Sequence, residues 1–227
     1  MGEDQDVLKA VRKAFADTVR LKVQQFYDVV PKGSNSDLTG KFVEELVRGF
    51  VQQWIAPCIL AHGTLHPHDA ATDASLRQLG PSQIDGIVYD PRLGPAIIRE
   101  GSFLVTHPAF CRGIIEIKTS TTDIKKFEDD LQLRYRKYLA PAWEDTPFLC
   151  QNEVMGIIIQ DANPKLKSSP DWLSAPLYDY RLADHCPIFI LFKERDGAYK
   201  SYEPAIDAMI KALFQGNWQR GLAANRM

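Results

Sequence analysis

Asp85, Glu116 and Lys118 lie inside two apolar segments of this 227-residue chain. Asp85 belongs to the run 83–90, and Glu116 and Lys118 belong to the run 114–120. Charged groups on a buried strand lose their hydration, and a bound divalent cation with several oxygen ligands is a common compensation. Glu116 and Lys118 are two residues apart, so on a strand their side chains point to the same face. If Asp85 lies on the neighbouring strand, two carboxylates and one ammonium group converge on one spot.

A predicted helix upstream, residues 38–55, offers a further acidic group. Its apolar stripe is formed by six side chains: Phe42, Val43, Leu46, Val47, Phe50 and Trp54. At about 100° per residue, Glu44 lies at the border of this stripe, whereas Glu45 lies nearly opposite it. A carboxylate at the border can reach a site beside the sheet, and one on the opposite side stays in water. We therefore expect Glu44 to join the site, with a solvated Glu44–Glu45 surface pair as the alternative.

The order of these segments resembles the PD-(D/E)XK nuclease superfamily, in which an aspartate is followed by Glu-x-Lys on a strand. The helix segment Gly40–Arg48, then Gln-Ile-Asp-x-Ile-x-Tyr-Asp from Gln83, then Glu-x-Lys from Glu116 is also similar to a bacterial nuclease-like domain family of unassigned function. The resemblance covers roughly residues 33–139.

The resemblance implies a metal-dependent nuclease that hydrolyses the phosphodiester bonds of nucleic acid, with DNA as the expected partner. It implies that Asp85 and Glu116 bind Mg²⁺ or Mn²⁺, and that the main-chain carbonyl of Ile117 is a further ligand. The matching lysine, Lys118, would orient the attacking water and steady the developing negative charge, and the helix glutamate Glu44 would complete the catalytic set. The chemistry agrees, because a metal lowers the pKa of bound water and a fixed positive charge stabilises the transition state.

Two other interpretations stay open. Glu116 and Lys118 can form a structural ion pair on an exposed strand face. The chain can also be a catalytically silent, nuclease-derived binding module with a relic or regulatory cation site. A net charge of −2 favours this second alternative, because it provides no general basic field for nucleic acid. Any contact with DNA or RNA must therefore come from a local patch.

Composition and length are those of an ordinary globular protein, with 45% hydrophobic and 25% charged residues. We expect an N-terminal helix over residues 1–32 and one nuclease-like domain over residues 33–227. The four cysteines, Cys58, Cys111, Cys150 and Cys186, are far apart and are expected to be reduced thiols of a cytoplasmic protein rather than zinc ligands. The acidic first residues contain no secretory signal, and no apolar run is long enough to span a membrane. The sequence leaves open whether the chain forms a homodimer.

Strand and helix patterns alternate along the chain, which predicts an α/β fold with a central mixed sheet flanked by helices, as in restriction endonucleases. Strands are expected over residues 58–65, 83–89, 96–99, 103–106, 113–119, 155–160, 187–193 and 199–202. Helices are expected over residues 6–30, 38–55, 123–139, 170–182 and 204–214.

Overall fold

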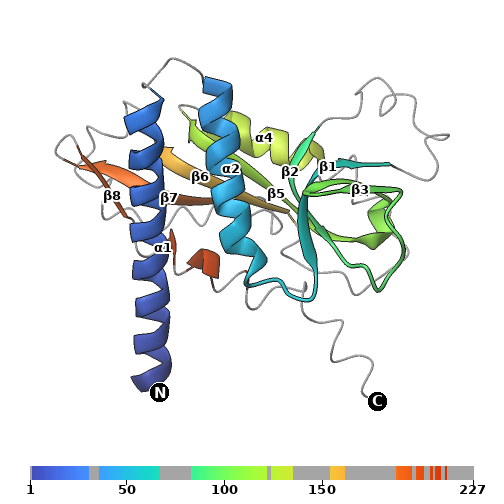
Figure 1. Ribbon diagram of the computed structural model, residues 1–227, viewed down its shortest axis with the longest axis horizontal. Coiled ribbons are helices and arrows are strands. Elements are labelled where there is room, and N and C mark those ends of the chain that lie inside the picture. The colour runs from blue at the N-terminus through green and yellow to red at the C-terminus, as the bar shows by residue number, and fades with distance from the viewer. Residues whose placement is uncertain are drawn as a thin grey trace.

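A computed structural model of the chain describes residues 2–30, 36–66, 83–121, 124–134, 154–161, 188–195 and 198–201, together with 205–206, 208–210 and 213. Its centre is an eight-stranded sheet with the order β3-β4-β1-β2-β5-β6-β7-β8 (Figure 1). The strands are β1 (Ile59–Leu65), β2 (Ile84–Tyr89), β3 (Ile98–Glu100), β4 (Phe103–Thr106), β5 (Cys111–Thr121), β6 (Val154–Asp161), β7 (Ile188–Arg195) and β8 (Ala198–Ser201).

The sheet is mixed. Strand β2 runs antiparallel to both of its neighbours, β1 and β5, whereas β6 and β7 continue parallel to β5. Both edge strands, β3 and β8, pair antiparallel with their neighbours. The expected α/β fold with a mixed sheet is therefore confirmed.

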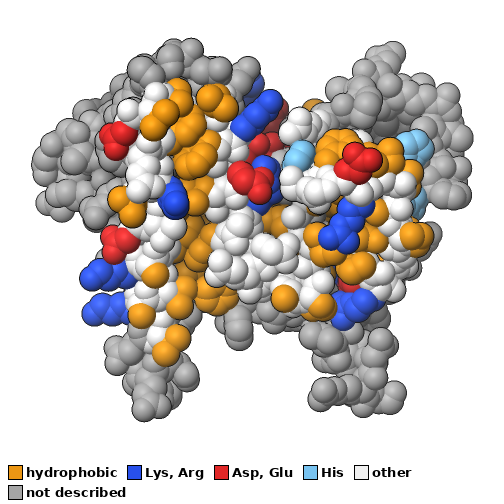
Figure 2. Space-filling view, in the orientation of Figure 1, with side chains coloured by type: hydrophobic (Ala, Val, Ile, Leu, Met, Phe, Trp, Pro, Cys, Tyr) orange, Lys and Arg blue, Asp and Glu red, His pale blue; other side chains and the backbone are white. Residues whose placement is uncertain are grey.

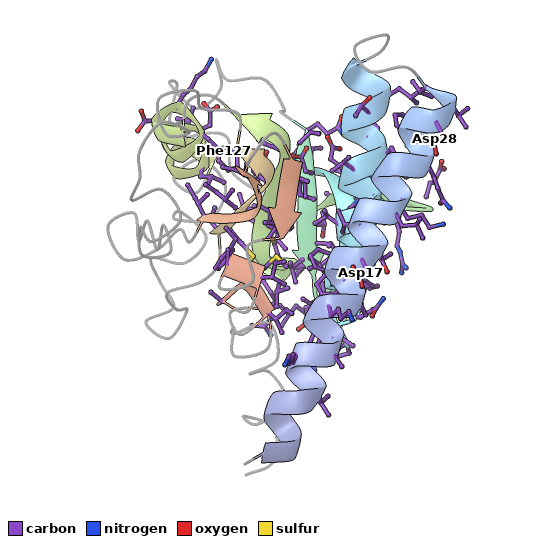
Figure 3. The ribbon with its side chains drawn as sticks, turned by 90° about the vertical axis from the view of Figure 1, so that its left-hand side faces the viewer. Asp17, Asp28 and Phe127 are labelled. Atoms are coloured by element: carbon purple, nitrogen blue, oxygen red, sulfur yellow. The ribbon has the colours of Figure 1, made fainter. Side chains whose placement is uncertain are left out.

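Helices cover both faces of the sheet. The helices α1 (Gly2–Val29) and α2 (Ser36–Gln52) lie side by side on one face, and α4 (Ile124–Arg134) lies on the other (Figures 1 and 3). A short 3-10 helix, η1 (Pro108–Phe110), leads into β5. Within the part of the chain that the structure describes, no helix combines the length and apolarity needed to cross a bilayer.

The apolar core forms two layers, one on each face of the sheet. Strand β5 contributes to both through its alternating side chains: Ile115 and Ile117 pack under α1 and α2, and Ile114 packs in the layer that contains Phe127 of α4. The two helices of the first layer are held together by aromatic contacts, with the ring centroids of Phe15 and Phe50 3.8 Å apart. The expected boundary between an N-terminal helix, residues 1–32, and a nuclease-like domain, residues 33–227, stays a prediction.

The observed element ends differ from the expected ones by a few residues. Strand β5 begins at Cys111 and continues to Thr121, because its ladder with β6 includes the polar end of the strand. Helix α2 ends at Gln52, three residues before the expected end at Ile55. Residues 205–206, 208–210 and 213 are helical, within the expected closing helix. The expected helix 170–182 and the end of the expected helix 123–139 lie outside the described residues.

Two of the four cysteines lie in the described ranges. Cys58 and Cys111 are both buried, and neither belongs to a disulfide. Burial raises the pKa of the Cys58 thiol to about 11, so at neutral pH this sulfur is protonated and unreactive. Cys150 and Cys186 lie outside the described residues.

Asp90 follows the C-terminal end of β2, and its carboxylate is fully buried, with 0% of its surface exposed. Arg92 in the following turn donates to both of its oxygens, at 2.8 Å and 2.7 Å, and Arg112 on β5 donates to Oδ2 at 3.1 Å. The hydrogen bonds from Arg92 are the main reason why the pKa of Asp90 falls to about 2. This pair of arginines neutralises Asp90 and ties the end of β2 to β5.

The substitution Asp90→Asn should lower the free energy of unfolding by about 3 kcal/mol, since it leaves two arginines without their buried partner. Because folding lowers the pKa of Asp90, its contribution is complete above the unfolded pKa of about 4 and is lost as the pH falls through about 2. Urea unfolding at neutral and acid pH measures both effects. The matched change Asp130→Asn, at an exposed position on α4, should shift stability by less than about 0.5 kcal/mol. An Asp90→Asn protein as stable as wild type would contradict this account.

Candidate active site

The register between β2 and β5 brings Asp85 next to Glu116. The antiparallel ladder pairs Ile87 with Ile114 and Gly86 with Ile115, and Asp85 and Glu116 are the next residues on the two strands. The Asp85 side chain also continues the ladder, because its Oδ2 accepts a hydrogen bond from the main-chain N–H of Ile117 at 2.9 Å. Asp85 is thereby fixed against the strand that carries Glu116 and Lys118.

The three residues differ in their access to solvent. Glu116 is buried, with 2% of its surface exposed, Asp85 is half-buried, and Lys118 is exposed. Strand alternation directs Lys118 to the same face as Glu116, one step nearer the end of β5. The set thus runs from a carboxylate in the core to an ammonium group at the surface, where a substrate can reach it.

Helix α2 supplies the next carboxylate, Glu44, whose side chain is 20% exposed. Burial is the largest cause of the raised pKa of Glu44, and the negative charge of Asp85 is the second. Lys118 acts on the same group in the opposite direction. Glu44 therefore lies within electrostatic reach of two of the residues on the strands.

Glu45 has a different environment. Its side chain is 62% exposed and accepts from Arg48 at 2.7 Å, on the solvent side of α2. The structure therefore brings Glu44 towards the strand carboxylates and leaves Glu45 at the surface.

Two further residues lie beside this set and were not singled out from the sequence. Arg48 donates from Nη1 to the main-chain carbonyl of Asp85 at 2.8 Å and is only 7% exposed. His62 lies in β1 where the register with β2 shifts, and among the described residues its buried Nδ1 has no hydrogen-bond partner. Burial is the first cause of the lowered pKa of His62, Arg48 is the second, and Asp85 acts in the opposite direction.

A sequence signal for Arg48 did exist. It follows Glu44 by four residues, so it lies on the same border of the apolar stripe, one helical turn later. Figure 2 shows acidic and basic side chains together where the surface of α2 meets that of β1 and β2, with a histidine across the same recess.

The carboxylates of Asp85 and Glu116 are oxygen ligands of the kind that a small hard cation prefers. Among the described residues, no three His, Cys, Asp or Glu side chains lie close enough together to hold a metal ion by themselves. Asp85 and Glu116 nevertheless form an adjacent pair, and Mg²⁺ in phosphoryl-transfer sites is held by one or two carboxylates with water and substrate oxygens as the remaining ligands. Asp85, Glu116 and the main-chain carbonyl of Ile117 are therefore the groups that could hold such an ion.

Two solved structures resemble this fold over most of its length. NucC of P. aeruginosa ATCC27853, in its cAAA-bound form, aligns with a TM-score of 0.56 and 14% identity, over 92% of this chain and 89% of that chain. NucC of E. coli MS115-1, also cAAA-bound, aligns with a TM-score of 0.58 and 13% identity, over 93% and 89%. No protein-family model and no curated protein matches the sequence. At these identities the likeness establishes a nuclease-like α/β fold.

In the metal-free protein, the substitution Glu44→Gln should change how the melting temperature depends on pH. Folding raises the pKa of Glu44 above its ordinary value of 4.5, so the folded state holds this proton to higher pH than the unfolded chain does. The resulting stabilisation is complete below the ordinary value and is lost as the pH rises through the raised one. Glu44→Gln should therefore flatten the fall in melting temperature above about pH 4.5.

Scanning calorimetry in EDTA across this pH range measures the two slopes. Equal slopes for wild type and Glu44→Gln would contradict the placement of Glu44 beside Asp85.

Proposed function

We propose that this chain is a Mg²⁺- or Mn²⁺-dependent nuclease that hydrolyses phosphodiester bonds, with DNA as its substrate. The observation that carries the proposal is the hydrogen bond from the Ile117 N–H to the Asp85 carboxylate, which fixes Asp85 against the strand segment that carries Glu116 and Lys118. Glu44 lies within electrostatic reach of Asp85 and Lys118. The nuclease-like fold supports the same assignment. The near-neutral net charge weakens the assignment without excluding it, because a bound cation also reduces the repulsion between the carboxylates and a phosphate.

Each residue has a separate task in this proposal. Asp85, Glu116 and the carbonyl of Ile117 would hold the ion, which when bound lowers the pKa of water and polarises the phosphoryl group. Lys118 would place its ammonium group near the attacking water and stabilise the charge that develops on the phosphorane oxygens.

Glu44 adds a carboxylate whose raised pKa suits it to take up a proton as the water attacks. The Glu44 side chain is 20% exposed, so that proton would leave to water afterwards.

Replacing Lys118 by methionine tests the catalytic role of its charge. The variant keeps most of the side-chain length and removes the ammonium group, so cleavage should fall about a hundredfold or more while the melting temperature stays near that of wild type. Turnover should be measured on single- and double-stranded DNA and RNA with Mg²⁺ or Mn²⁺. The control Lys13→Met changes an exposed lysine on α1 and should leave cleavage unchanged.

Undiminished cleavage by Lys118→Met would show that the lysine has no catalytic role. If wild type binds the ion but cuts none of the four substrates, the chain is the catalytically silent binding module instead.

A further inference from the structure

Arg48 forms a bridge between α2 and β2 inside the protein. Its Nε and Nη2 donate to Glu45 at 3.2 Å and 2.7 Å, and its Nη1 donates to the main-chain carbonyl of Asp85 at 2.8 Å. The same Nη1 lies 3.7 Å from a carboxylate oxygen of Glu44. One guanidinium group therefore contacts the helix carboxylates and the strand residue that carries Asp85.

The contact of Arg48 with the Asp85 carbonyl joins α2 to β2, unlike the ion pairs that Arg48 makes within α2. It joins residues 37 positions apart in the sequence. The carboxylate of Asp85 is held from the other side, by the N–H of Ile117 at 2.9 Å. Asp85 is thus fixed at its main chain by α2 and at its side chain by β5, which leaves it little freedom to shift away from Glu116.

The positive charge of Arg48 also acts on the carboxylates beside it. Glu44 lies within electrostatic reach of Asp85, and two like charges at short range destabilise each other when no cation is bound. The Arg48 guanidinium contacts both residues, at 2.8 Å from the Asp85 carbonyl and 3.7 Å from the Glu44 carboxylate. It therefore helps to hold them close together before an ion arrives.

We propose that Arg48 is a positioning residue that fixes Asp85 and Glu44 relative to β5 and thereby sets the affinity of the site for its divalent cation. This inference rests on the proposed function. It adds a residue that touches neither the ion nor the substrate but acts through the ligand that it holds. Lysine cannot replace it, because a single ammonium group cannot reach the Asp85 carbonyl and the Glu45 carboxylate with the fixed fork of a guanidinium.

The test is the affinity for Mn²⁺, measured by calorimetric titration on the full chain. Groups that orient metal ligands typically change metal affinity by about 10–100-fold when they are removed. Arg48→Met should therefore raise the Kd by that factor, and Arg48→Lys should raise it by at least about threefold. Glu45→Gln, which leaves the contact with Asp85 in place, should change it by less. Arg99→Met, which removes an exposed arginine on β3, should not change it.

A second measurement separates positioning from a merely structural role. The cleavage rate of the Arg48 variants should recover towards the wild-type kcat as the Mn²⁺ concentration is raised in proportion to the Kd. A role in folding alone would instead lower the active fraction at every Mn²⁺ concentration. If Arg48→Met does not fold, Arg48→Lys provides the same comparison.

An unchanged Kd in Arg48→Lys, or a rate that excess Mn²⁺ does not restore, would overturn this inference while the proposed function stands. If wild type itself neither binds Mn²⁺ nor cleaves nucleic acid, the proposed function fails, and the role of Arg48 fails with it.

Discussion

Two carboxylates on neighbouring strands of one sheet repel each other, and their proximity is the constraint on which the account of this protein depends. The register of β2 and β5 fixes the positions of Asp85 and Glu116, because a one-residue slip would turn every core side chain of β2 to the wrong face. Glu116 is buried, so water screens its charge poorly. A proton or a positive charge can offset the repulsion, and the two ends of β2 differ in the positive charge that the chain provides.

The two aspartates of the segment 83–90 show the contrast. Asp90 is surrounded by Arg92 and Arg112, which satisfy both of its oxygens and hold its pKa at about 2. Asp85 shares its region with Glu116 and Glu44, and the nearby Arg48 is shared in turn with Glu45. The first arrangement is neutralised and structural. The second gathers more carboxylates than basic groups, a composition that suits a divalent cation.

Much of the fold could be predicted from the sequence, because the signals are local. Alternating and apolar runs gave the strand from residue 84 to 89 and the core of β5, and helical periodicity placed α2 with its apolar stripe against the sheet. The same geometry favoured Glu44 over Glu45 for the recess. Helix geometry places Arg48 on the same border of the stripe as Glu44, but its contact with the Asp85 carbonyl spans 37 positions of the sequence and could not be predicted. His62 was missed because the shift of register in β1 leaves no periodic signal.

The melting temperature with and without Mn²⁺ tests the central claim most directly, because it needs no substrate. An ion that binds only the folded state at a hundredfold excess over its Kd adds about 2.7 kcal/mol, which for a chain of this length is roughly 5–10 °C. The account predicts such a rise at millimolar Mn²⁺ for wild type and none for the double variant Asp85→Ala, Glu116→Ala. The same rise in both proteins, or no rise in wild type, would contradict a metal site between β2 and β5.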